Sequence, residues 1–135
     1  MRDWRLNTSL KWKRKKDITD LVFLVSEWCH KNLQSNKETP MIWVDWSNSK
    51  LCGEYQIDEN EIFIYGKQHK SVKDIIDTTI HEWVHFLQDK KGLLRSLEVY
   101  KFSSNLNPNE LEAISIAKKN INKCWKGIKS KKVNI

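Results

Sequence analysis

The chain has few of the residues that cross-link or interrupt a fold: three cysteines, four glycines and two prolines among 135 residues. Cys29, Cys52 and Cys124 are odd in number and far apart, and no C-x-x-C pair occurs. These spacings argue against both a disulfide framework and a cysteine-based zinc site. We expect each thiol to be free and buried, and the protein to be cytoplasmic.

Long apolar runs are also missing, and the longest, residues 21–25, is far shorter than a membrane span. The chain opens with a charged segment that no apolar stretch follows, so we expect neither a signal peptide nor a membrane partner. A hydrophobic content of 39%, with seven tryptophans, is typical of a globular protein. We expect one monomeric domain over 1–135, with a basic arm at 1–16 and a basic tail at 128–135.

Acidic residues are fewer than basic ones, 17 against 24, and the formal net charge is +7. The positive charge is concentrated in residues 11–16 and 118–132. Such clusters can follow the phosphates of a nucleic acid. No nucleic-acid-binding motif accompanies them, so a solvated basic surface is the favoured interpretation and a nucleic-acid partner is the alternative.

The most informative stretch is His81-Glu82-Trp83-Val84-His85, which contains H-E-x-x-H. Several features predict a helix over 72–90: a capping-box pattern at Ser71–Asp74, an apolar stripe, no proline or glycine from 71 to 91, and Gly92 as a stop. The stripe consists of Ile76, Ile80, Trp83, Val84 and Leu87. The two histidines lie at its border, where a half-buried site would be.

This spacing has a direct chemical meaning. Residues four apart share one face of a helix, so His81 and His85 can both bind one metal ion. Zinc accepts neutral imidazole readily and keeps an open position for water in catalytic sites. Glu82 would lie beside that position and serve as the general base. The alternative is an amphipathic helix with two surface histidines.

The remaining pattern predicts an α+β fold: an N-terminal helix, a small antiparallel-rich sheet, the H-E-x-x-H helix and a C-terminal helix. Asp17 and Asp20 mark a start for the first helix, and Pro108 marks the start of the last one. We expect residues 92–106 to form a loop or short helical pieces. The other expected elements are a helix at 18–35, strands at 41–46, 52–57 and 61–65 with a turn at 58–60, and a helix at 108–126.

Two glutamates on the last helix compete to be the third metal ligand. Glu110 shares a face with apolar Ile114, Ala117, Ile121 and Cys124, whereas Glu112 shares one with Ser115, Lys119 and Lys123. The inward face favours Glu110 and leaves Glu112 as the alternative. Asp89, Glu98 or another histidine would be the ligand if neither glutamate is.

With these residues the sequence resembles the gluzincin zinc metallopeptidases, in a form similar to the minimal zincins of phage and bacteria. Glu110–Ala113 matches the E-x-x-A of many gluzincins, in which the glutamate binds zinc and the alanine allows close packing. Residues 112–115 match the E-A-I-S of thermolysin-like members equally well. Ile114 or Ile116 stands where families often place Asp or Asn. The resemblance covers about residues 60–125.

The resemblance implies a zincin-like fold and zinc-dependent peptide hydrolysis with Glu82 as general base. Such a mechanism needs a second electrophile, for which Tyr100, His69 and Arg95 are the candidates. The strand at 61–65 would be the edge that binds an extended peptide substrate. Two rivals are a zinc-containing binding or regulatory module that acts through its basic surface, and a metal-dependent hydrolase of non-peptide substrates.

Overall fold

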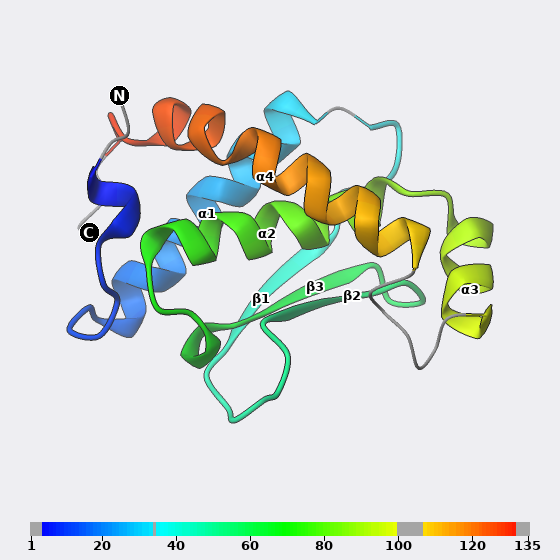
Figure 1. The fold of residues 1–135 in the computed structure, drawn as a ribbon, viewed down its shortest axis with the longest axis horizontal. Helices are drawn as coiled ribbons and strands as arrows, with labels where there is room; N and C mark the ends of the chain where they lie inside the picture. The colour runs from blue at the N-terminus through cyan, green and yellow to red at the C-terminus, as the bar shows by residue number, and fades with distance from the viewer. Residues whose placement is uncertain (1–3, 34, 100–106, 132–135) are drawn as a thin grey trace.

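A computed structural model describes residues 4–33, 35–99 and 107–131 of the chain. It has an α+β architecture in which the helices lie on one side of a small sheet (Figure 1). The elements in order are η1 Trp4–Asn7, α1 Lys15–Asn32, β1 Met41–Asp45, β2 Gly53–Gln56, β3 Glu61–Tyr65, η2 Gly66–Gln68, α2 Val72–Leu87, α3 Lys90–Val99 and α4 Pro108–Ile128. No described helix is both long and apolar enough to cross a membrane.

The sheet is mixed, with the strand order β1-β3-β2. β2 and β3 form the expected antiparallel hairpin, but β1 is parallel to β3, so the expectation of an antiparallel-rich sheet was wrong. Successive strands alternate in direction, and β3 inserts between the two earlier strands. The first and third strands therefore run the same way.

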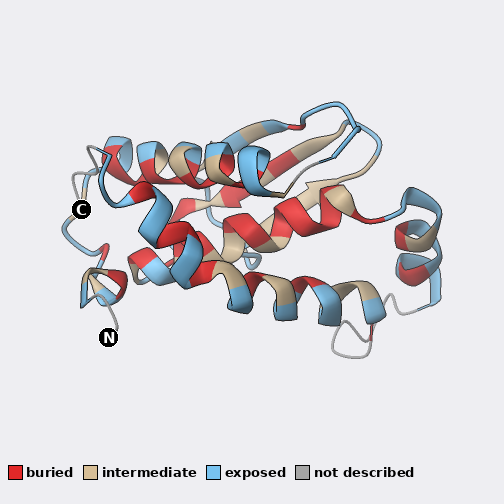
Figure 2. Cartoon of the chain, turned by 90° about the horizontal axis from the view of Figure 1, so that it is seen from above, coloured by how far each residue is buried: buried red, intermediate tan, exposed pale blue. Residues whose placement is uncertain are grey.

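The sheet has one buried and one open face. Ile62 and Ile64 are fully buried against the helices, whereas Glu61, Phe63 and Tyr65 alternate onto the other side and are only half-buried. α2 runs through the centre of the helical layer, and its contact with α4 is the most extensive between any two elements (Figure 2). The core therefore surrounds α2, which holds this helix rigidly in place.

The first helix begins earlier than expected. α1 starts at Lys15, and Asp17 does not cap it: its carboxylate instead accepts hydrogen bonds from the Arg14 Nε, at 2.9 Å, and Nη2, at 3.2 Å. The N-cap position is Arg14, which makes no side-chain capping bond. The basic arm before it is tied to the core, because Leu6 and Leu10 are buried and Thr8 O accepts from Val72 N.

The central helix ends earlier than expected, because Gln88 adopts an extended conformation (ψ 152°). The Asp89 carboxylate then accepts from Gly92 N at 2.9 Å, and α3 begins. Gly92 thus lies inside a new helix rather than stopping the old one. Among the cysteines, Cys29 and Cys124 are buried as expected, but Cys52 is exposed.

Candidate metal centre

Local sequence and packing fix the orientation of α2. Ser71 Oγ accepts from Asp74 N, and Asp74 Oδ2 accepts from Ser71 N, which forms the predicted capping box. The apolar stripe turns into the core, where Ile76 and Ile80 are fully buried. His81 and His85 therefore lie at the edge of the buried face, with side chains 18% and 11% exposed.

α4 brings the third group. Asn107 Oδ1 accepts from Asn109 N at 2.8 Å and from Glu110 N at 3.4 Å, so it caps the helix one turn before the site's carboxylate. Ala113 and Ala117 are completely buried. Because their side chains are small, α4 can approach α2 closely and place Glu110 opposite the two histidines.

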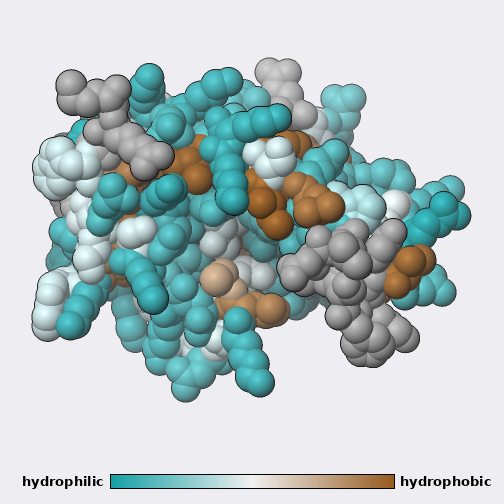
Figure 3. Space-filling view, viewed as in Figure 1, coloured by the Kyte–Doolittle hydropathy of each residue, from teal (hydrophilic) through white to brown (hydrophobic). Residues whose placement is uncertain are grey.

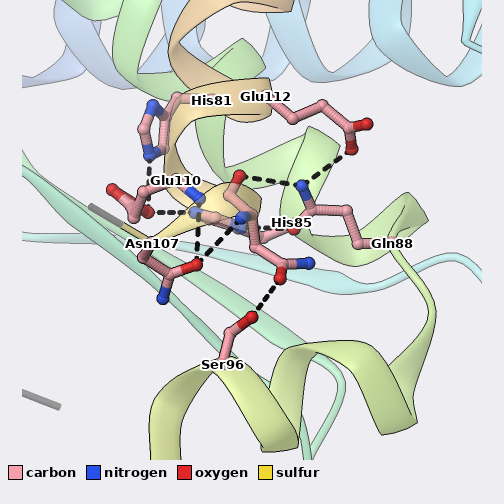
Figure 4. Close-up of polar contacts among 8 residues, drawn as sticks. His81, His85, Gln88, Ser96, Asn107, Glu110 and Glu112 are labelled. Carbon is pink, nitrogen blue, oxygen red and sulfur yellow. Dashed lines mark hydrogen bonds and ion pairs between the residues drawn. The ribbon is translucent and has the colours of Figure 1, made fainter. Parts of the chain in front are cut away.

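Glu110 meets both imidazoles at the same carboxylate oxygen (Figure 4). His81 Nε2 lies 3.1 Å from Glu110 Oε1, and His85 Nε2 also contacts Oε1. One ligand atom from each of the three residues lies within 4.8 Å of the others. Zinc bonds of about 2.0–2.1 Å in tetrahedral geometry place two ligand atoms about 3.3 Å apart, so the group fits a metal ion of this kind.

Glu112, the competing glutamate, does not join this group. It is exposed, and its Oε1 accepts from Gln88 Nε2 at 2.9 Å. Gln88 Nε2 also donates to Asn109 O at 2.9 Å, so its amide oxygen is left facing His85 Nδ1, at 2.7 Å. Because an amide oxygen can only accept a hydrogen bond, this contact assigns a proton to His85 Nδ1.

The charges of the group are strongly coupled. Hydrogen bonds from His81 and His85 hold the pKa of Glu110 far below its usual value, and burial opposes this only in part. Burial lowers the pKa of His85, but its hydrogen bond to Glu110 and the nearby charge of Glu82 outweigh it and raise the pKa. The carboxylate is thus kept ionised between two nitrogen donors, which is the charge state a metal ligand needs.

Glu82 is 7% exposed and makes no hydrogen bond with any described residue. Burial raises its pKa to about 7, although the charges of His81 and His85 act in the opposite direction. Gly53 on β2 makes room for this side chain, since a Cβ there would lie 3.1 Å from Glu82 Cγ and 2.9 Å from Thr78 Cγ2. β2 can therefore pass directly over Glu82.

The metal group and Glu82 line a cavity of about 550 Å³ between β2, α2 and the start of α4. Hydrophobic side chains form several separate patches on this face of the molecule, among them one over α4 and one beside the start of β2 (Figure 3). The other lining residues are Leu51, Cys52, Gly53, Glu54, Tyr55, Ile57, Asp77, Thr78, Leu93, Leu97, Asn107, Asn109 and Ile114.

The two described candidates for a second electrophile do not line this cavity. His69 is buried, with Nε2 2.9 Å from Thr78 Oγ1, and does not line the cavity. Arg95 is exposed on α3 and does not line it either. Tyr100 lies outside the described residues. Asp89 and Glu98, the reserve ligands, are exposed and do not belong to the metal group.

The expectation that residues 61–65 form a free edge of the sheet was wrong. β3 is the central strand and is paired on both sides, whereas β2 is an edge strand and lines the cavity. Two further residues of the site, Gln88 and Gly53, were not predicted from the sequence. Gln88 could have been found, because it stands one helical turn after His85, but no local pattern reveals that Gly53 meets Glu82.

No family model, no curated protein and no solved structure matches the chain. What the structure supports is a candidate metal site of His81 and His85 on α2 and Glu110 on α4.

Replacing Gln88 by Leu should reduce the affinity for a divalent metal ion by about 10- to 100-fold, the usual loss when the partner that orients a histidine ligand is removed. Titration against a chromophoric chelator would measure it. Gln68→Leu, at an exposed position on η2, is the control and should leave the affinity unchanged. Full affinity in a folded Gln88→Leu protein would show that the His85–Gln88 bond does not support the site.

Proposed function

We propose that this chain is a zinc-dependent metallopeptidase in which His81, His85 and Glu110 hold the ion and Glu82 is the general base. The observation that carries the proposal is that one cavity holds both the metal group and a buried carboxylate that has no hydrogen-bond partner among the described residues. Two imidazoles and a carboxylate leave a fourth tetrahedral position open, which is the pattern of catalytic rather than structural zinc sites. A bound zinc ion would act as a Lewis acid that lowers the pKa of water and polarises a carbonyl.

The side chain of Glu82 would move the protons of the reaction. Its carboxylate takes one proton from the attacking water while the water oxygen bonds to the carbonyl carbon of the scissile peptide. When the C–N bond breaks, Glu82 gives that proton to the leaving nitrogen. Burial raises the pKa of this carboxylate, which favours a group that must hold a proton between the two transfers.

The cavity supports a peptide as the substrate. β2 has one edge paired with β3, and its other edge is left unpaired among the described strands. An extended peptide can add to such an edge through main-chain hydrogen bonds. The peptide would then cross the cavity next to Glu82, because β2 passes directly over that side chain.

An exposed aromatic residue in the basic arm favours one second candidate, a zinc-containing binding module for a protein or nucleic acid. Trp12 is 85% exposed, and Lys11 Nζ lies 5.1 Å from its ring centroid. Exposed aromatic rings among lysines can stack on bases and contact phosphates. This function needs no proton acceptor at Glu82, so it explains less of the site.

The test is metal content followed by cleavage. Elemental analysis of protein purified without chelators should find one zinc per chain in the wild type and none in His81→Ala. The wild-type protein should then cut members of a proteome-derived peptide library, with cleavage sites identified by mass spectrometry. A folded wild type that binds no zinc, or one that holds zinc but cuts no more peptides than His81→Ala does, would contradict the proposal.

A further inference from the structure

Glu54 is a fixed carboxylate at the rim of the cavity. It lies on β2, and its Oε1 accepts from the Tyr65 hydroxyl at 2.8 Å and from Gln56 Nε2 at 3.1 Å. Its other oxygen, Oε2, makes no hydrogen bond with the described residues. Two donors thus hold the group in one orientation and leave one oxygen available to a ligand.

The cavity carries the opposite charge to the rest of the protein. The chain has a net charge of +7, yet four carboxylates and neither lysine nor arginine occur among the described residues that line the cavity. Glu110 belongs to the metal group and Glu82 is the proposed base. Asp77 lies near the charges of Lys118 and Lys73. Glu54 is therefore the carboxylate that is best placed to meet a cation from outside.

Glu82 is a second carboxylate that faces this cavity without a hydrogen-bond partner among the described residues, and it is 7% exposed. A buried polar group without a partner is unfavourable unless something else satisfies it. The acidic lining therefore adjoins a carboxylate that water or a ligand in the cavity would satisfy.

We propose that Glu54 makes the cavity selective for peptides that carry a lysine or arginine side chain next to the site of reaction. The inference rests on the proposed function, because it takes the substrate to be a peptide lying along the free edge of β2. Side chains of such a peptide alternate between the two faces of the sheet, and those on the face of Glu54 pass over its free oxygen. The aliphatic stem of a lysine or arginine can cover Leu51, which is 52% exposed at the same rim.

Binding rather than cleavage is the direct test. Glu82→Gln protein loaded with zinc keeps the peptide intact and is mixed with fluorescein-labelled hexapeptide pools. Each pool has lysine, norleucine or glutamate fixed at one position, and fluorescence anisotropy gives its dissociation constant. At one position the lysine pool should bind about fivefold more tightly than the norleucine pool, which is the upper range for a partly exposed ion pair. The glutamate pool should bind most weakly.

Two double variants give the matched comparison. Glu54→Gln in the Glu82→Gln protein removes the charge but keeps an oxygen that can accept from Tyr65, and it should abolish the preference for lysine. Glu59→Gln makes the same change at an exposed turn residue that does not line the cavity, and it should preserve the preference. Equal binding of lysine and norleucine pools at every position, or a preference that survives Glu54→Gln, would overturn the inference. A lysine preference in a protein that cleaves nothing would support the inference and contradict the proposed peptidase activity.

Discussion

Glu82→Gln should lower the rate of peptide hydrolysis by about 10²–10⁴-fold, the contribution usually credited to general acid–base catalysis. Glutamine has nearly the shape of glutamate, so it fits beneath Gly53 where the Glu82 side chain lies. Its amide oxygen does not accept a proton from water near neutral pH, and the transfer to the leaving nitrogen is lost as well. The metal should be retained, because Glu82 is not a member of the metal group.

Comparison of kcat/KM for one peptide found in the library screen, together with zinc content, measures this effect. The variant should also be at least as stable as the wild type, since the substitution replaces a buried carboxylate, which no described residue contacts by a hydrogen bond, by a neutral group. Loss of zinc in Glu82→Gln would show that the residue supports the metal rather than the reaction. Equal rates of cleavage by the two proteins would refute its role as the base.

The residues of this site that the sequence predicts are those whose positions follow from the periodicity of a single helix. The positions of His81, Glu82 and His85 follow from helical periodicity, and the capping box at Ser71 and Asp74 fixes where that helix begins. Periodicity also favoured Glu110 over Glu112, because the inward face of α4 is visible in the spacing of its apolar residues. The structure places Glu110 beside both histidines and Glu112 beside Gln88.

The features that the sequence did not predict depend on contacts between distant segments. The parallel pairing of β1 with β3 arises because β3 enters between two earlier strands, and no local pattern encodes that order. The early end of α2 depends on Lys37, whose Nζ donates to the carbonyl oxygens of Phe86 and Gln88 at 3.1 and 2.6 Å. Lys37 thus donates hydrogen bonds to carbonyl oxygens at the C-terminal end of α2. These oxygens lack the amide donors that a further helical turn would have provided.

These distant contacts have a shared consequence for the site. Gln88 faces His85 where α2 stops, and its amide reaches α4 through Asn109 O and Glu112. The end of one helix is thereby joined to the start of the other, beside the metal group. The geometry of His85 and the position of Glu110 are therefore set by the same network.

The last prediction separates the two glutamates of α4. Glu110→Gln should weaken zinc binding by more than about 100-fold, because it changes a proposed ligand, whereas loss of an outer partner costs about 10- to 100-fold. A neutral amide oxygen is a poorer zinc donor than a carboxylate and does not offset the charge of the ion. Glu112→Gln should change the affinity by less than about threefold. Glu112 is exposed, its charge is worth little there, and a glutamine oxygen can still accept from Gln88 Nε2.

Both variants lose one negative charge on the same helix, so the net charge of the protein changes by the same amount in each. The ratio of their zinc dissociation constants, measured by competition with a chelator, therefore reports the specific role of Glu110. The opposite ratio would assign the ligand to Glu112, against the observed placement of its side chain. Equal, small effects would mean that neither carboxylate binds the ion and that the contact of Glu110 with the two histidines is a salt bridge of the metal-free protein.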